Sequence, residues 1–210
     1  MKVLIRQATI VCKDSPHNQT VKDILISDGV IQTIGDSIDA TGVDTLIEME
    51  NLHVSIGWMD VFSHFCDPGF EHKETLTTGA AAAAAGGFTD VMIIPNTRPV
   101  LQSKSQIEYI IQQSTSLPVT IHPIGAITKN AEGKELTEMY DMKDAGAIAF
   151  SDGLHALQSA PVMIKALQYV SARQATIIQI PDDRSLSANG LVHEGITSTL
   201  MGLPGKPAIA

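Results

Sequence analysis

The sequence has few cysteines, few basic residues and no long apolar segment, and each shortage excludes a class of protein. Two cysteines in 210 residues cannot form a disulfide framework, so we expect a reduced, cytoplasmic setting. Lys and Arg number 14 against 23 Asp and Glu, and this net charge of −9 argues against a nucleic-acid or anionic-membrane surface. No apolar run approaches the roughly 20 residues of a membrane span. Residues 1–15 also lack the apolar core and cleavage site of a secretory leader.

Residues 1–51 lack any helical pattern. Residues 2–12 alternate and are rich in branched side chains, residues 23–35 form two strand-like runs around Ser-Asp-Gly, and residues 44–50 form another. Short strands joined by turns are typical of small all-β units. We therefore predict a small β-sandwich over residues 1–51.

From residue 52 onward, apolar strand-like runs alternate with segments of helical length. Parallel strands that are buried on both faces produce this rhythm of short, continuous, branched runs. Five such runs occur, at residues 53–62, 88–95, 117–127, 147–152 and 175–181. Residues 52–210 therefore predict an α/β fold, the first five units of a (β/α)8 barrel of the TIM type. A closed barrel needs eight strands in about 250 residues, so we expect this domain to be incomplete and the chain to be a fragment.

The strand that ends near His64 is the first candidate for chemistry. Side chains at i and i+2 share one face of a strand, so Asp60, Phe62 and His64 are expected on the same face. A His-x-His pair at such a strand end would bind a divalent metal, because both imidazoles converge from one face. Here Phe62 takes one of the two positions. The residues alone leave His64 open between a structural residue and a metal ligand.

Three long motifs in the same order resemble the dihydroorotases of the amidohydrolase superfamily. Residues 54–100 are similar to the first barrel segment of that family, with its pattern Asp-x-His-x-His-x-Arg-(Asp/Glu)-Pro-Gly, then Lys-Glu-Thr, an Ala/Gly-rich helix and Pro-Asn-Thr-x-Pro. Residues 124–152 resemble the third and fourth units, and residues 190–208 the fifth. The resemblance implies a barrel enzyme of pyrimidine biosynthesis. Its reaction would be the reversible opening of a cyclic amide, dihydroorotate, by hydroxide bound to zinc.

The resemblance also implies site residues, and the match is uneven. His64 and Asp152 match metal ligands of the family, and Asn96 matches an asparagine that helps to bind dihydroorotate. Phe62 stands at the position of the first metal histidine, and Cys66 at that of the arginine that holds the substrate carboxylate. Phenyl offers a metal no donor atom, and a thiol cannot replace the bidentate guanidinium.

The fifth strand departs from the family as well, because Gln179 or Ile180 stands where a histidine ligand is expected. The remaining metal histidine and the catalytic aspartate would lie beyond Ala210, so no catalytic residue is assigned. We expect zinc to bind weakly or not at all. His155 and His193 are open as replacement ligands, against the simpler interpretation as loop residues.

Three functions remain open. The favoured one is a non-catalytic dihydroorotase-like protein, a homo-oligomer that assembles with aspartate carbamoyltransferase. The alternative is an active, metal-dependent dihydroorotase with ligands drawn from His64, Asp152, His155 or His193. The third is a binding module that keeps Asn96 and its pocket but performs no chemistry. Cys66 is expected to be a small buried thiol rather than a ligand or nucleophile.

Overall fold

The computed structural model describes residues 1–187 and 189–210, which divide into two compact units, Met1–Gly57 and Trp58–Ala210. This division lies a few residues after the predicted boundary between residues 51 and 52. Strand β5 (His53–Ser55) pairs in parallel with β1 (Lys2–Val11), with Thr9 opposite His53, and so belongs to the first unit. The sequence pattern does not predict this pairing, because it indicates a single strand of the barrel over residues 53–62.

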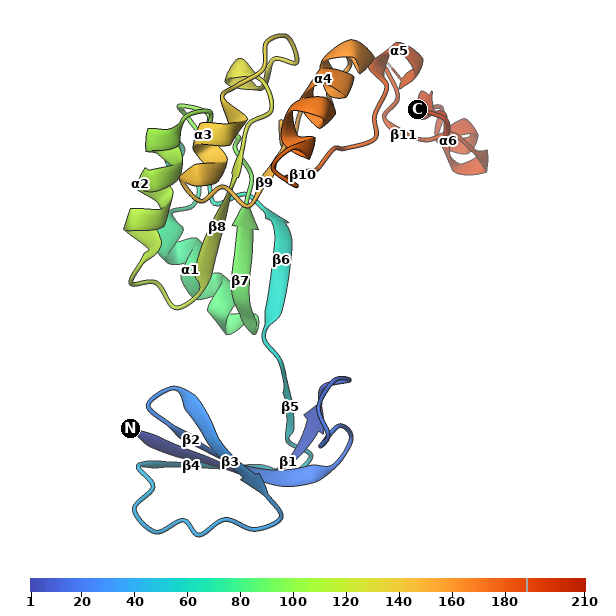
Figure 1. Ribbon diagram of the computed structural model, residues 1–210. Helices are drawn as coiled ribbons and strands as arrows, with labels where there is room; N and C mark the ends of the chain where they lie inside the picture. The colour runs from blue at the N-terminus through green and yellow to red at the C-terminus, as the bar shows by residue number, and fades with distance from the viewer. Residues whose placement is uncertain (188) are drawn as a thin grey trace. The chain divides into compact units, whose positions relative to one another are not determined.

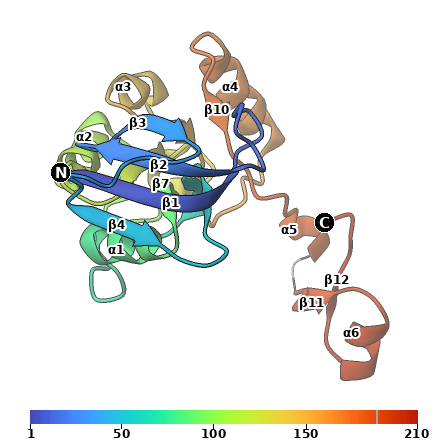
Figure 2. The same ribbon diagram turned by 90° about the horizontal axis from the view of Figure 1, so that it is seen from below.

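The first unit is a single mixed β-sheet. Its strands run in the order β3-β2-β1-β4, and β5 lies off this path and pairs with β1. The bounds are β2 (Val21–Ser27), β3 (Val30–Gly35) and β4 (Thr45–Glu48). Figure 2 shows β1, β2, β3 and β4 in one layer. A sandwich needs a second sheet facing the first. The described residues of this unit form one sheet, which agrees with the all-β character that was predicted, and no second sheet faces it among them.

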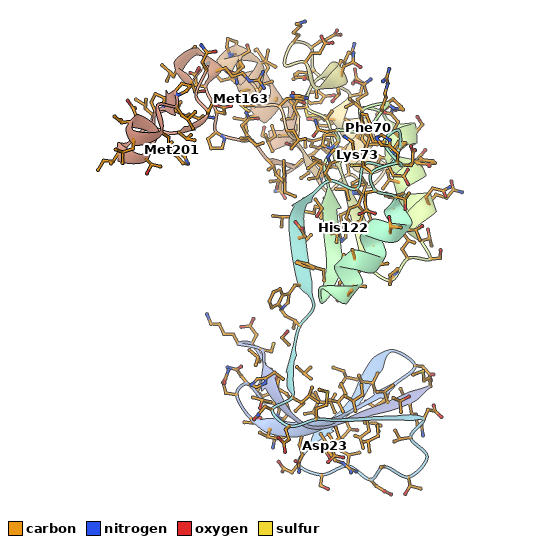
Figure 3. The ribbon with its side chains drawn as sticks, turned by 180° about the vertical axis from the view of Figure 1, so that it is seen from behind. Asp23, Phe70, Lys73, His122, Met163 and Met201 are labelled. Atoms are coloured by element: carbon orange, nitrogen blue, oxygen red, sulfur yellow. The ribbon has the colours of Figure 1, made fainter. Side chains whose placement is uncertain are left out.

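A tight hairpin joins β2 and β3, as the Ser-Asp-Gly pattern predicts. Asp28 and Gly29 have φ angles of 51° and 81°, the left-handed values of a two-residue turn that matches strand twist. The buried carboxylate of Asp23 accepts hydrogen bonds from the backbone N–H groups of Gln7 and Ile38, at 2.9 Å each (Figure 3). Asp23 thereby fixes an irregular point of β1, where Gln7 has a positive φ of 49°.

The second unit contains a five-stranded parallel sheet in the order β10-β9-β8-β7-β6. Its strands are β6 (Trp58–Ser63), β7 (Phe88–Ile93), β8 (Thr120–Gly125), β9 (Ala149–Phe150) and β10 (Thr176–Ile177). The helices that alternate with them are α1 (Leu76–Ala85), α2 (Lys104–Ser114), α3 (Met139–Asp144) and α4 (Ala160–Ser171). The sheet curls, and α1, α2 and α3 lie along one face of it (Figure 1). The predicted incomplete barrel of five parallel strands is confirmed.

The main core lies between these helices and the outer face of the sheet. Leu76 and Ala80 from α1, and Ile107 and Ile110 from α2, are at most 4% exposed. Helix α1 begins where the Thr75 side chain accepts the backbone N–H of Thr78, and its alanines favour helix and permit close approach. These features explain why the run of alanines is a packed helix rather than a flexible segment.

A second apolar cluster occupies the inner, concave face of the sheet. Its buried members come from β7, β8, β9 and the residue after β7: Met92, Ile94, Ile124 and Ala149. Phe62 of β6 and Ile178, which follows β10, pack against them. In a barrel this face forms the filled interior.

The last part of the described chain contains short elements only. They are α5 (Arg184–Ser187), β11 (Val192–His193), α6 (Ile196–Met201) and β12 (Gly205–Lys206), with β11 and β12 paired in parallel. Gly202 ends α6 with a left-handed φ of 63°. Among residues 1–187 and 189–210, no helix is both long and apolar enough to cross a membrane.

Candidate functional site

Three candidate residues follow strands of the parallel sheet and lie together at its carboxyl end. His64 follows β6, Asn96 follows β7, and Asp152 follows β9. The Nε2 atom of His64 is 3.0 Å from the backbone oxygen of Asn96, and Nδ2 of Asn96 donates to the backbone oxygen of Asp152 at 3.2 Å. The expectation that His64 and Asp152 lie at the same end of the sheet, near Asn96, is confirmed. Barrel folds gather their sites at this end.

Thr128 binds both oxygens of the Asp152 carboxylate. The Thr128 backbone N–H donates to Oδ1 at 2.9 Å, and the Thr128 hydroxyl donates to Oδ2 at 2.6 Å. The side chain is 1% exposed, and this burial raises the pKa of Asp152, against the opposing effect of the Thr128 hydrogen bonds. Both carboxylate oxygens are therefore engaged within the chain. Thr128 is not among the residues predicted from the sequence, where its only signal is its place directly after the apolar run 117–127.

The side chains of His64 and Asp152 line different cavities. Asp152 lines a cavity of about 420 Å³ together with His155, Ser159 and Arg184, between the loops after β8 and β9. His64 lines a smaller one of about 260 Å³, with Glu74 and residues of α1. The expectation that both face a common pocket is therefore wrong for the described residues.

An irregularity in β6 causes this separation. The pairing of β6 with β7 shifts register between Asp60 and Ser63. Asp60 accepts the backbone N–H of Phe62 at 2.9 Å and the hydroxyl of Ser63 at 2.7 Å. Asp60 and Ser63 line the cavity beside α1, whereas Phe62 packs on the inner face. The strict alternation that was expected for Asp60, Phe62 and His64 fails here, because a bulge changes which side chains share a face.

Phe62, which stands where the family resemblance implies a metal-binding histidine, packs against the apolar cluster on the inner face. Its ring is half-buried and packs against the group that contains Met92, Ile94, Ile124 and Ala149. This is the face from which a barrel presents ligands to a central metal. A histidine at this position would have no polar partner within that cluster.

Cys66 lies in the tight turn that follows His64. It is 7% exposed, has a positive φ of 63°, and its Sγ atom lies 3.7 Å from the backbone oxygen of His64. The predicted small buried thiol is confirmed.

Asp67 accepts the backbone N–H of Leu76 at 3.1 Å, so this carboxylate holds the start of α1. In the same loop, Lys73 Nζ lies 5.4 Å from the centroid of the Phe70 ring (Figure 3).

The other candidates are spread over the second unit. His155 is exposed in the cavity that Asp152 lines, and His193 is exposed on β11. Gln179 and Ile180 line a further cavity of about 370 Å³ beside α4, where the Gln179 side chain donates to the backbone oxygen of Ile180 at 3.0 Å. In the described part of the chain, these residues do not converge on His64.

The donor groups present do not fit a zinc site. In residues 1–187 and 189–210, no three His, Cys, Asp or Glu side chains lie close enough together to hold a metal ion. Catalytic zinc sites use three protein ligands as a rule. Here the carboxylate of Asp152 is engaged by Thr128, and the apolar ring of Phe62 occupies the inner face.

Comparison with known proteins identifies the family. The sequence model of the family described as "Dihydro-orotase-like" matches residues 53–210. A dihydroorotase of Pelotomaculum thermopropionicum is 42% identical over 210 residues, which is 100% of this chain and 49% of that protein. A dihydroorotase of Syntrophus aciditrophicus is 38% identical over 213 residues, covering 100% of this chain and 50% of that protein. The chain thus spans about half the length of the curated relatives it matches.

Solved structures agree on the fold. An L-hydantoinase (dihydropyrimidinase) from Arthrobacter aurescens superposes with a TM-score of 0.73 at 21% identity, over 88% of this chain and 41% of that one. A crystal structure of a dihydroorotase superposes with a TM-score of 0.57 at 15% identity, over 84% of this chain and 50% of that one. At such identities the likeness concerns the fold alone. Together with the sequence matches over its whole length, the parallel sheet and the loops at its carboxyl end show that this chain belongs to the dihydro-orotase-like family.

Proposed function

We propose that the chain is part of a dihydroorotase-like protein of pyrimidine biosynthesis that does not catalyse ring opening. The observation that carries this proposal is the position of Phe62, packed into the apolar inner face where the family resemblance requires a metal-binding histidine. Phenyl has no lone pair for a metal. Zinc would have to be held at the remaining positions, with fewer ligands than catalytic sites use.

Two further features support a non-catalytic role. Cys66 stands in place of the arginine that the resemblance assigns to the substrate carboxylate. Its side chain is buried, so it is not exposed to a ligand. The carboxylate of Asp152 already accepts two hydrogen bonds from Thr128. A metal at Asp152 would have to share these two oxygens with Thr128 within a buried site. The three features are independent, so restoring one of them is not expected to restore activity.

The proposed biological role is assembly. In this proposal the protein forms a homo-oligomer and binds aspartate carbamoyltransferase, with the fold retained after the chemistry is lost. The retained core supports this, because the helices of the second unit still bury a continuous apolar cluster that includes Ile107, Ile110 and Phe150. A protein that is kept only as a scaffold needs this core but no metal ligands.

One observation favours the alternative, an active dihydroorotase with a modified ligand set. Asp152 and His155 line the same cavity of about 420 Å³, so two of the substitute ligands are neighbours. Zinc at this place would need a third ligand, because no third His, Cys, Asp or Glu of the described residues lies close enough to complete a site there. The two candidate functions therefore differ in where metal would bind.

Metal content and turnover of the full-length protein decide between these functions. We expect sub-stoichiometric zinc by elemental analysis, and no turnover of dihydroorotate or carbamoyl aspartate above background. The variants Phe62→His, Cys66→Arg and their combination are expected to remain inactive. The dihydroorotase of Pelotomaculum thermopropionicum, assayed in parallel, is the positive control. Stoichiometric zinc with turnover in the unaltered protein would overturn the proposal, and loss of both in His155→Ala would then support the alternative.

Assembly is tested separately. The full-length protein and the aspartate carbamoyltransferase of the same organism are mixed and analysed by size-exclusion chromatography with light scattering. The proposal expects a complex heavier than either component alone, together with a homo-oligomer of the protein by itself. Independent elution of the two proteins at micromolar concentration would remove the proposed partner.

A further inference from the structure

The side-chain amide of Asn96 is occupied by a turn of the same chain. Its Oδ1 atom accepts the backbone N–H of Leu154 at 2.9 Å, and its Nδ2 atom donates to the backbone oxygen of Asp152 at 3.2 Å. Both ends of one amide are therefore bound by the three-residue turn 152–154. Asn96 follows β7 and the turn follows β9, so the contact crosses the end of the strand between them, β8.

Gly153 makes this close contact possible. A Cβ atom built on Gly153 would lie 1.6 Å from Oδ1 and 2.7 Å from Cγ of Asn96, which no side chain tolerates. Gly153 also has a φ of +60°, a conformation that glycine adopts at little cost. The amide of Asn96 thus rests directly on the backbone of the turn. The fit is specific, because any other residue at position 153 would push the two apart.

The backbone of Asn96 adds a third connection. Its carbonyl oxygen lies 3.0 Å from Nε2 of His64, so Asn96 links the ends of β6, β7 and β9. Two further hydrogen bonds fix the conformation of the turn. Asp152 is bound by Thr128, and the Ser151 hydroxyl accepts the backbone N–H of Gly153 at 2.9 Å. The turn is therefore a preformed partner for Asn96.

We propose that the turn 152–154 acts as an internal ligand that blocks one edge of the Asn96 amide against small molecules that would pair with it through an amide group, as a cyclic amide does. The turn presents one C=O acceptor and one N–H donor, the same pair of groups that a cyclic amide presents. A carboxamide nitrogen has two N–H groups and its oxygen two lone pairs, so the turn occupies one edge of the Asn96 amide, where Oδ1 and one N–H are both used. An external amide that pairs with this same edge must displace both hydrogen bonds. This autoinhibitory contact rests on the proposed function and deepens it, and the predicted role of Asn96 in binding substrate stays a prediction that the experiments below test.

Amide hydrogen exchange in the full-length protein tests the contact itself. Asn96→Ala removes the acceptor of the Leu154 N–H, so we expect Leu154 to exchange at least tenfold faster than in the unaltered protein. The matched control is Gln102→Ala. Gln102 is also a carboxamide that accepts a backbone N–H, that of Asn130 at 2.6 Å, but it lies in another loop. The control should leave the exchange of Leu154 unchanged. Unaltered exchange in Asn96→Ala would overturn the proposal.

A double variant separates the close contact from general loss of stability. Gly153→Ala in the unaltered background should lower the melting temperature strongly, because its Cβ would meet the Asn96 amide. In the Asn96→Ala background the same change should lower it distinctly less, since only the strain of the positive φ remains. Equal shifts in both backgrounds would mean that Asn96 does not rest on Gly153.

Dihydroorotate and carbamoyl aspartate serve as the probe ligands. With the side-chain amide of Asn96 observed by nitrogen-15 NMR, we expect no shift of its signal at millimolar ligand in the unaltered protein. A saturable shift, accompanied by faster exchange at Leu154, would show that external ligands displace the turn and would overturn the autoinhibitory role. Neither readout requires zinc or turnover. Their failure is therefore distinguishable from failure of the proposed non-catalytic function, which is measured by metal content and activity.

Discussion

Thr128 binds both oxygens of the Asp152 carboxylate, with its hydroxyl at 2.6 Å from Oδ2 and its backbone N–H at 2.9 Å from Oδ1. The same hydroxyl accepts the backbone N–H of Gly133 at 2.8 Å. One threonine therefore connects the end of β9 with the loop after β8 and fixes that loop against the sheet. The residue that matches a metal ligand of the family is thus also part of the hydrogen bonding that supports these loops.

Removing the Thr128 hydroxyl should destabilise the protein markedly. Thr128→Val keeps the shape but leaves one oxygen of the buried Asp152 carboxylate and the N–H of Gly133 without this partner. Loss of a hydrogen bond to a buried charged group predicts a decrease of about 2–3 kcal/mol in the free energy of unfolding. Urea denaturation at pH 7 measures it. The control is Thr115→Val, because the exposed Thr115 hydroxyl only bonds back to its own helix at 3.1 Å, and we expect a change within about 0.5 kcal/mol.

Asp152 should also make stability depend on pH. Burial raises its pKa in the folded state above the unfolded value of about 3.9. A raised pKa means that folded Asp152 favours the protonated form. Its contribution is therefore fully present below the unfolded pKa and is lost as the pH rises through the folded one. Asp152→Asn, which cannot ionise, should gain stability relative to the unaltered protein as the pH rises above about 4. A constant difference between the two proteins from pH 3 to pH 7 would contradict this.

Phe62 should contribute to stability through its apolar contacts. Phe62→Ala removes a half-buried ring from the cluster of Met92, Ile94 and Ile124, so we expect a loss of about 1–2 kcal/mol, below the 3–5 kcal/mol of a fully buried ring. Phe62→Leu is the matched control and should lose less than half as much. Thermal or urea unfolding of the three proteins measures the effect. A neutral Phe62→Ala variant would show that the ring is not part of the cluster in solution.

Much of the second unit follows from its sequence, because the alternation of branched strands and longer segments reflects burial on both faces of a parallel sheet. The rhythm predicts the strands that contain Val91, Ile121 and Phe150, and all three side chains are buried. The boundary at Gly57 was not predictable in the same way. Whether residues 53–55 pair with β1 or continue into β6 is decided by a partner strand far away in the sequence.

The candidate site was only partly predictable for a similar reason. Strand ends can be located from sequence, so the proximity of His64, Asn96 and Asp152 could be expected. The directions of their side chains could not be, because they depend on a bulge between Asp60 and Ser63 and on a bond from Thr128. Neither feature leaves a pattern in the local sequence. The positions were thus predictable, and the pairing of their polar atoms was not.

Gly79 should be required within α1 despite its low helix propensity. A Cβ atom at this position would lie 2.8 Å from three carbon atoms of the buried Phe65 ring. Gly79→Ala gains about 1 kcal/mol of helix propensity, but overpacking of a core contact costs typically 1–3 kcal/mol, so we expect a net loss. Thr77→Ala, at an exposed position of the same helix, should be neutral or slightly stabilising. Circular dichroism during thermal unfolding compares the two, and a stabilised Gly79→Ala would contradict the close packing.

The last prediction concerns the pair formed by Asp90 of β7 and His122 of β8. His122 is labelled in Figure 3. Nε2 of His122 lies 2.8 Å from Oδ1 of Asp90, and this hydrogen bond, helped by one from the Thr89 hydroxyl at 2.9 Å, lowers the pKa of Asp90. A lowered pKa contributes stability above the unfolded value of about 3.9, and this stability is lost as the pH falls through the folded value.

Asp90→Asn should therefore destabilise the protein at pH 7 and have a smaller effect near pH 3, where the unaltered Asp90 is itself becoming protonated. Urea unfolding at several pH values between 3 and 7 measures the difference. In a His122→Phe background the largest cause of the lowered pKa is absent, so the pH dependence of the Asp90→Asn effect should shrink. The pair would have no electrostatic role if Asp90→Asn cost the same at every pH in both backgrounds. It would then act only as an ordinary polar contact between the two strands.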